Sequence, residues 1–269
     1  MKQNITNIII FAAIIVVVHV IYQIVIWPAA EQILAAAQQN GTVAPRHWAI
    51  LLKDMEQQIC FMLLFIGLYY AMIVSRAMNA DEVLFHEDFL DGSGPKRSDL
   101  IDALKEFDAS EKFKQTPLLR TIRAAIRRLI ITDNVQNASD AIDQTIEAIS
   151  AKNDNELAVL KYICWAVPSI GFVGTVRGIG AAMAQADSAV AGDIGPMTES
   201  LGIAFNSTLV ALVISIFLMM VLFYLQSKQD SHIERIQVFC EEKFIERVSN
   251  SPQHSNADDV VLTTEASEA

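Results

Sequence analysis

Four long apolar runs divide this sequence, and each is long enough to cross a lipid bilayer. A transmembrane helix needs about 20 mainly apolar residues, because in lipid the backbone must satisfy its own hydrogen bonds. The runs cover residues 5–27, 59–78, 157–186 and 203–225. The apolar fraction of 52% and the mean hydropathy of +0.34 agree with this membrane content. The sequence therefore predicts an all-α, polytopic membrane protein with four transmembrane helices.

The first apolar run permits two interpretations. A secretory signal peptide would end near Pro28-Ala29-Ala30, which makes a poor small-residue cleavage site. The run is much longer than the ~7–15 apolar residues of a signal core, and only Lys2 supplies a basic side chain before it. We therefore favour an uncleaved membrane anchor over a cleaved signal, which would leave three spans.

Lysines and arginines predict the orientation of the spans, since basic loops stay on the cytoplasmic side. Residues 79–156 hold ten of them, the link 28–58 holds two and the link 187–202 holds none. We therefore expect both termini and the middle region in the cytoplasm and both links outside. The expected regions are an N-terminal transmembrane hairpin with its outer link (1–78, link 28–58), a cytoplasmic helical region (79–156), a second transmembrane hairpin with a cytoplasmic extension (157–248) and a disordered acidic tail (249–269).

Helical periodicity continues outside the apolar runs, which predicts long helices that extend into the cytoplasm. It joins residues 138–163 to the third run and carries the fourth run to Phe244. One further amphipathic pattern covers residues 100–107, and a second begins at Pro117. Four arginines lie around the polar arc of this second pattern: Arg120, Arg123, Arg127 and Arg128. They fit a solvated face, contact with anionic lipid head groups, or a docking face for a cytoplasmic partner.

Several classes of function lack the residues that they need. The net charge of −11 argues against a nucleic-acid partner. Cys60, Cys164 and Cys240 lie far apart and have neither metal-binding nor disulfide spacing. The sequence contains no nucleophile with a matching base and no phosphate-binding loop. We therefore expect no enzymatic activity, no cofactor and no metal site.

The third run contains small and polar residues that a plain membrane anchor does not need. Gly171, Gly174 and Gly178 lie on one helical face and allow another backbone to approach closely. Thr175 lies between two of these glycines in sequence, and Arg177 follows it. A hydroxyl beside a small-residue face predicts a packed seam next to a polar path.

The fourth run carries a polar group of its own, formed by Asn206, Ser207 and Thr208. If the third and fourth spans form a hairpin, Thr175 and Thr208 meet at a similar depth. Each threonine alone also fits a helix residue that bonds its own backbone. Because two such hydroxyls occur on adjacent spans, we predict an ion pathway that includes Thr175, Thr208, Ser207 and Asn206.

Charged residues near the outer ends of the spans leave alternatives open. Arg177 either reaches the outer interface or faces an acidic partner. Three acidic residues are available at that interface: Asp187, Asp193 and Glu199. The outer link carries three further titratable residues, which we expect to form a solvated surface: His47, Asp54 and Glu56. No Asp or Glu lies in the central part of any span, so a proton conductor would need a carboxylate from another chain.

Two stretches resemble signatures of the MotA/TolQ/ExbB proton channel family, and the motifs are nearest to the TolQ/ExbB branch. Residues 168–179, PSIGFVGTVRGI, resemble its P-x-x-G-x-x-G-T-V-x-G-[IM] signature, and residues 202–212, GIAFNSTLVAL, resemble its A-L-x-x-T-x-x-G-L stretch. The chain departs from the family at three positions. Arg177 stands where Trp or another apolar residue is frequent, Phe205 replaces Leu, and Ala211 replaces Gly.

The resemblance implies a stator-type subunit of the bacterial inner membrane. Five copies would surround a dimer of a single-span ExbD/TolR/MotB-like partner with a membrane Asp. Proton flow along that Asp, served by Thr175 and Thr208, would drive mechanical work on the cell envelope; sodium is the less favoured ion. Pro168 would lie at a kink, and five small residues would allow tight packing: Gly171, Gly174, Gly178, Ala204 and Ala211. The alternative is a non-conducting scaffold subunit of an envelope complex.

Overall fold

The computed structural model describes residues 2–39, 47–79, 85, 101, 104–105 and 116–249. Within these ranges all regular elements are helices and none is a strand. Four helical segments are long and apolar enough to span a membrane: Ile5–Ala37, Met55–Arg76, Val135–Met183 and Gly195–Ile245. The chain is an all-α polytopic membrane protein, which confirms the fold class predicted from its apolar runs.

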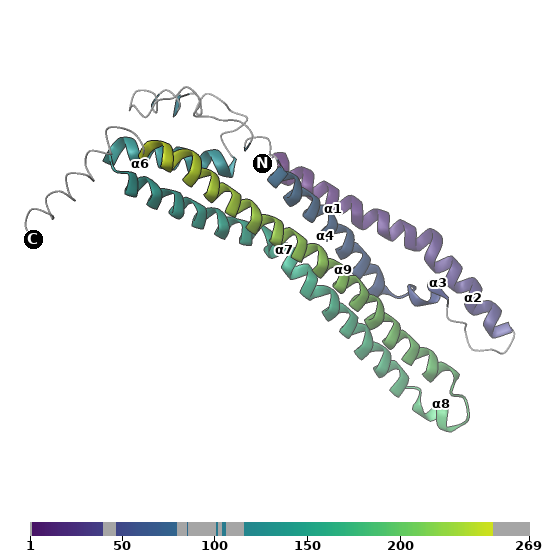
Figure 1. Cartoon of the computed structure of the whole chain (residues 1–269). Coiled ribbons are helices and arrows are strands. Elements are labelled where there is room, and N and C mark those ends of the chain that lie inside the picture. The colour runs from purple at the N-terminus through teal and green to yellow at the C-terminus, as the bar shows by residue number, and fades with distance from the viewer. Residues whose placement is uncertain are drawn as a thin grey trace, which may run out of the picture. The chain divides into compact units, whose positions relative to one another are not determined.

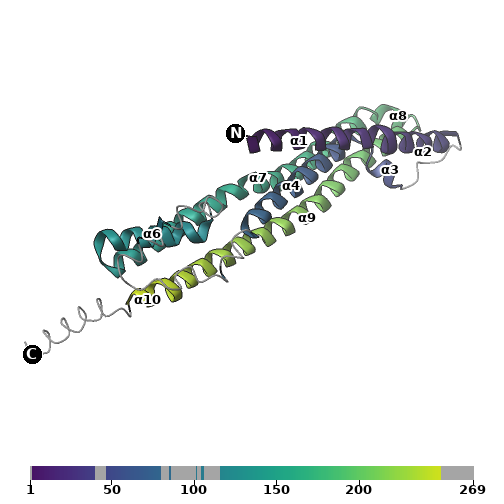
Figure 2. The same cartoon turned by 90° about the horizontal axis from the view of Figure 1, so that it is seen from above.

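The chain folds into two compact units, each built from two separate stretches of sequence. The first unit contains residues 1–73 and 157–224, and the second contains residues 74–156 and 225–269. Two long helices, α7 (Val135–Met183) and α9 (Gly195–Cys240), contribute to both units (Figure 1, Figure 2). Within the first unit, α7 packs closely against α9 at Gly171, Gly174 and Gly178. With 49 and 46 residues the two helices far exceed the about 20 that a bilayer requires, as the helical periodicity predicted.

The N-terminal part of the first unit is a helical hairpin. Helical structure is continuous through α1 (Lys2–Ile21), the π-helical segment η1 (Tyr22–Ile26) and α2 (Trp27–Gln39). The short α3 (Trp48–Leu51) then leads to α4 (Met55–Asn79). The π-helical segment lies just before a proline, a residue without a backbone N–H and a common cause of local departures from α-helical bonding. The first apolar helix therefore continues well beyond its predicted end.

Polar side chains join α4 to α1 near both ends of this hairpin. Tyr69 Oη donates to Asn7 Oδ1 at 3.2 Å, and Gln58 Nε2 lies 2.8 Å from His19 Nδ1. The His19 ring also makes an edge-to-face contact with Trp27, with ring centroids 5.9 Å apart. His19 is thus a packing residue at the helix interface.

The remainder of the first unit is the hairpin of α7 and α9, which is interrupted only by α8 (Ala186–Val190) and the turns around it. Pro168 lies inside α7 and does not end it. Gly192 precedes α9 with φ at 103°, a region that favours glycine. The third and fourth spans are therefore antiparallel neighbours, which is the arrangement that brings their polar residues to the same depth.

The second unit has a core formed by one amphipathic helix and the ends of the two long helices. The amphipathic helix α6 (Pro117–Thr132) has a proline at its first turn, as predicted. Its buried face contacts the start of α7, the end of α9, and the segments η3 (Glu241–Ile245) and α10 (Glu246–Ser249). The residues of this core are Leu118, Leu119, Ile122, Ala125, Ile126, Leu129, Ala138, Ile142, Ile236, Cys240, Phe244 and Val248.

The four arginines of α6 lie away from this core. Arg120, Arg127 and Arg128 are exposed, and Arg123 is half-buried. This is the polar arc expected from the sequence. Contact with lipid head groups or with a cytoplasmic partner stays a prediction.

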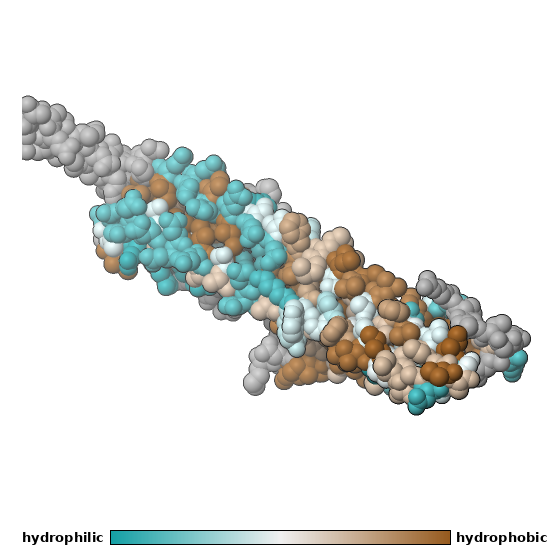
Figure 3. All heavy atoms as spheres, turned by 90° about the horizontal axis from the view of Figure 1, so that it is seen from below, coloured by the Kyte–Doolittle hydropathy of each residue, from teal (hydrophilic) through white to brown (hydrophobic). Residues whose placement is uncertain are grey.

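The surface of the first unit is apolar, and that of the second is hydrophilic. In Figure 3 brown side chains cover much of the first unit, whereas teal side chains predominate on the second. Large exposed residues of the first unit include Val16, Phe172, Phe205 and Ile216. Such a surface suits contact with lipid tails or with neighbouring transmembrane helices.

Some expectations fall outside the described residues. They are the predicted helix at 100–107, apart from residues 101, 104 and 105, and the acidic tail beyond residue 249. Leu104, one of the described positions, packs against the core of the second unit.

Candidate functional site

A seam of small residues joins α7 to α9. A Cβ atom added at Gly171 would lie 2.5 Å from Ala211 Cβ, and one added at Gly178 would lie 2.7 Å from Ala204 Cβ. Both alanines are fully buried. Because real Cβ atoms do not approach so closely, glycine is required at both positions for the helices to pack as they do.

Gly174 lies at the centre of this seam and contacts two different elements. Its missing side chain makes room for Ser207 of α9, and an added Cβ would also lie 3.1 Å from Glu56 Cγ of α4. Ser207 is 1% exposed and donates a hydrogen bond to Ala204 O at 3.0 Å. Of the predicted pathway residues, Ser207 therefore lies within the packed seam, whereas the neighbouring Asn206 is half-buried.

The hydroxyls of Thr175 and Thr208 contact each other across the hairpin. Thr175 Oγ1 lies 3.3 Å from Gly171 O and 3.2 Å from Ala204 O. Thr208 Oγ1 lies 3.2 Å from the same Gly171 oxygen and 3.4 Å from the same Ala204 oxygen. The two threonines do meet, as the hairpin predicted, and each also lies within reach of its own helix backbone.

These four oxygens form a node with more hydrogen-bond acceptors than donors. Each hydroxyl has one proton to donate and lone pairs to accept with, and a carbonyl only accepts. Gly171 O and Ala204 O already accept backbone N–H groups of their own helices, and Ala204 O has a third hydroxyl contact from Ser207, so the node offers spare lone pairs and few protons. Both threonines are half-buried. The node therefore suits a visiting proton donor or a small cation.

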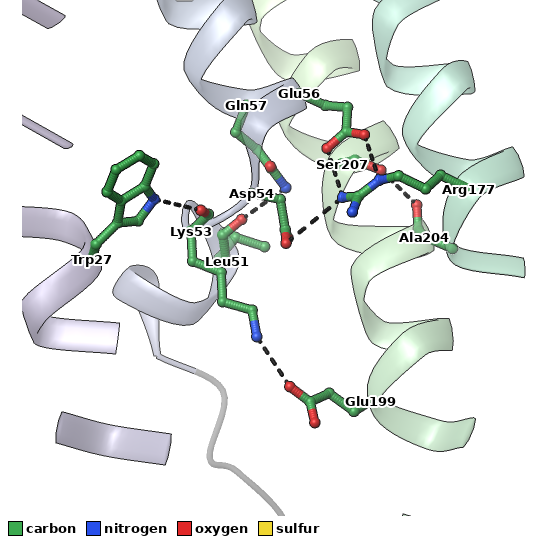
Figure 4. A network of polar contacts seen from close by, with 10 residues as sticks. All are labelled: Trp27, Leu51, Lys53, Asp54, Glu56, Gln57, Arg177, Glu199, Ala204 and Ser207. Carbon is green, nitrogen blue, oxygen red and sulfur yellow. Dashed lines mark hydrogen bonds and ion pairs between the residues drawn. The ribbon is translucent and has the colours of Figure 1, made fainter. Parts of the chain in front are cut away.

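A second polar cluster lies at the start of α4 and in the residues just before it (Figure 4). Arg177 Nε lies 2.7 Å from Glu56 Oε1, and Nη2 lies 2.8 Å from Oε2, which makes a two-point ion pair. Arg177 Nη2 is also 3.8 Å from Asp54 Oδ1. The Glu56 side chain is 10% exposed and that of Arg177 is 52% exposed. The pair thus removes a carboxylate from water and keeps its charge balanced.

A neighbouring ion pair ties the residues just before α4 to α9. Lys53 Nζ lies 3.0 Å from Glu199 Oε1, while Lys53 O accepts a hydrogen bond from Trp27 Nε1 at 2.9 Å. Gln57 Nε2 donates to Leu51 O at 3.2 Å and closes the turn between them (Figure 4). The residues from 51 to 57 therefore contact the first, third and fourth spans.

Comparison with known proteins gives a family match for part of the chain. Residues 113–238 match the model of the MotA/TolQ/ExbB proton channel family. Over this region the chain is similar to that family. This family region contains Thr175, Thr208, Arg177 and the whole glycine seam, but Glu56 and the rest of the N-terminal hairpin lie outside it. Searches among curated proteins and among solved structures gave no match.

The intrachain partners of Arg177 differ from the three acidic residues that the sequence suggested, Asp187, Asp193 and Glu199. Within the described residues its ion pairs are with Glu56 and Asp54, and contact with an acidic partner protein stays a prediction. Glu199 pairs with Lys53 instead. The reason is that Glu56 lies in the first turn of α4, on the side that packs against the family region.

The expectation of a solvated surface in the outer link was wrong for its two carboxylates. Glu56 is 7% exposed and the Asp54 side chain 10% exposed, while His47 is exposed and caps α3 by accepting from Ala49 N at 3.2 Å. Burial raises the pKa of Asp54, and the charges of nearby Lys53 and Arg177 oppose the rise. The one sequence feature that could have predicted this burial is Arg177, because a cationic residue in an apolar span needs an acidic partner on another span.

Proposed function

We propose that this chain is a stator-type proton-channel subunit of the bacterial inner membrane, with cytoplasmic N- and C-termini. Its family region supports a role in proton conduction. The observation that carries the proposal is the node formed by Thr175, Thr208 and the carbonyls of Gly171 and Ala204. An acceptor-rich group on a small-residue seam is suited to receive a protonated group that moves past it.

The titratable group comes from a second protein in this proposal. The node holds hydroxyls and carbonyls, none of which exchanges a proton near neutral pH. The buried carboxylate of Glu56 is paired with Arg177 on the other side of α7 and is not part of the node. We propose that the carrier is a membrane Asp of a single-span, ExbD/TolR/MotB-like partner, present as a dimer within a homopentamer of this chain.

Proton flow through such a complex would drive mechanical work on the cell envelope. The Asp, once protonated, donates to the node; once ionised, it is repelled by the node's carbonyl oxygens. This difference gives each protonation state its own preferred position relative to the pentamer. If the Asp takes up a proton in one position and releases it in the other, proton motive force moves the partner relative to the pentamer.

The proposal is tested by proton flux into vesicles that contain this chain and a single-span protein encoded beside its gene. A pH-sensitive dye inside the vesicles reports the flux under an imposed potential, and vesicles with a proton ionophore are the positive control. We expect flux that needs both proteins and is abolished by replacing the partner's membrane Asp with Asn. A sodium gradient at constant pH tests the coupling ion.

The opposite result would favour a scaffold. A stable complex without proton or sodium flux, in vesicles that respond to the ionophore, would contradict the proposal. The glycine seam and the two ion pairs would then serve assembly alone, in a non-conducting subunit of an envelope complex.

A further inference from the structure

The glycine seam divides α7 into two flanks that carry different chemistry. At about 100° per residue, Thr175 lies about 100° to one side of Gly174, and Arg177 lies about 60° to the other. Thr175 meets Thr208 on the first flank, and Arg177 meets Glu56 on the second. The node and the ion pair therefore lie on opposite sides of the same short stretch of helix.

Helix α4 packs against α7 over several turns. The Glu56 side chain packs at Gly174, and Cys60 Sγ lies 3.8 Å from Val167 O. Further along, a Cβ at Gly67 would lie 3.4 Å from Leu160 Cδ1. The two-point pair between Glu56 and Arg177 is the directional contact at the outer end of this interface.

The seam limits the rotation of α7 by excluding side chains, but it supplies no directional bond. A guanidinium that binds both oxygens of a carboxylate is different, since its planar fork accepts only a narrow range of orientations. The carboxylate is buried, so turning α7 away from α4 would leave it unpaired. The ion pair thus resists the rotation that would separate Thr175 from Thr208.

We propose that Glu56 is a positioning residue for the ion pathway: through Arg177 it fixes the rotation of α7 so that Thr175 faces Thr208. The ion-pathway part rests on the proposed function, whereas the positioning itself is a geometric property of the chain. This gives the N-terminal hairpin, which lies outside the family region, a defined task in the channel.

Disulfide formation between cysteines at the two threonine positions measures this geometry directly. The test protein is the full chain with Thr175→Cys and Thr208→Cys, and with Ala at Cys60, Cys164 and Cys240. The hydroxyls are in contact, so the substituted thiols lie within disulfide range. The rate of cross-linking by a mild oxidant is read by mass spectrometry of the linked peptides.

Adding Glu56→Gln should slow cross-linking at least about fivefold, an effect typical of coupled neighbouring residues. The exchanged pair, Glu56→Arg with Arg177→Glu, should recover most of the rate, which also shows that the protein still folds. Lys53→Gln is the matched control, because it breaks the other ion pair of the same link and should leave the rate unchanged. An unchanged rate in Glu56→Gln, an equal loss in Lys53→Gln, or no recovery in the exchanged pair would overturn the proposal.

Proton flux measured on the same substitutions in the threonine-containing chain separates this inference from the proposed function. Cross-linking that depends on Glu56 in a complex without flux would contradict the channel and leave the positioning intact. Flux and cross-linking that are both insensitive to Glu56→Gln would contradict the positioning and leave the channel intact.

Discussion

A side chain at Gly174 of α7 would meet two different helices, because Ser207 and Glu56 both lie close to the position of its Cβ. Gly180, two residues beyond the last seam glycine, has no atom within 4 Å of an added Cβ. The two glycines share one helix and differ only in what surrounds them. Alanine substitutions at the two positions therefore separate the effect of steric clashes with neighbouring helices from the effect of glycine on helix stability.

Gly174→Ala should destabilise the first unit, and Gly180→Ala should not. Overpacking a closely packed site costs about 1–3 kcal/mol, whereas alanine in an open helix position gains up to about 1 kcal/mol over glycine. Thermal unfolding of the purified chain in detergent measures both effects. Equal melting temperatures for the two variants would contradict the close packing of α7 at Gly174.

The raised pKa of Asp54 predicts that the stability of the residues before α4 depends on pH. Burial raises this pKa, opposed by Lys53 and Arg177, while Glu56 adds to the rise. The folded state therefore favours the protonated acid. The stability that this provides is present below the ordinary carboxyl pKa of about 3.9 and is lost as the pH rises through the raised value.

Asp54→Asn should consequently flatten the pH dependence of unfolding. The melting temperature of the variant relative to the native chain should be higher at neutral pH than at acidic pH. Asp187→Asn, at an exposed position of α8, controls for the chemistry of the substitution. If the melting temperatures of Asp54→Asn and the native chain differed by the same amount at both pH values, the burial of Asp54 would be contradicted.

At the scale of elements, α6 depends on the ends of the two long helices for its stability. Ile126 is fully buried in the core of the second unit, and Ile131 in the same helix is 76% exposed. A 16-residue helix in isolation is marginal in water, so packing must supply most of its stability.

Ile126→Ala should cost about 2–5 kcal/mol, as expected for a buried isoleucine, while Ile131→Ala should be nearly neutral. Hydrogen exchange of the α6 backbone amides measures the local effect. Faster exchange is expected in Ile126→Ala alone. Equal protection in the two variants would contradict the packing of α6.

The sequence was sufficient for elements whose pattern is local. Pro117 and the apolar positions after it predicted α6, and the apolar runs predicted the four spans. The first helix was predicted too short, because its apolar run ends at Trp27 while helical structure continues to Gln39. The pairing of Thr175 with Thr208 was accessible because both flank small residues on adjacent spans.

At the scale of the whole molecule, the sequence could not reveal which distant residues pair. Glu56 and Arg177 are 121 residues apart, and no periodicity links them. The burial of Glu56 follows from the packing of α4 on α7, a tertiary contact that a local pattern does not encode. The family resemblance did not help either, since the matched region begins at residue 113.

Removal of the two node hydroxyls without a change in side-chain shape tests whether Thr175 and Thr208 serve proton conduction. Valine replaces the threonine hydroxyl by a methyl group of similar size, and serine keeps the hydroxyl. The measurement is proton flux in vesicles that hold the complete complex with Thr175→Val, Thr208→Val, Thr175→Ser or Thr208→Ser. We expect a loss of about fivefold for each valine variant, the equivalent of one hydrogen bond between neutral groups, and near-native flux for each serine variant. Native flux in both valine variants would contradict the role of the node in proton conduction.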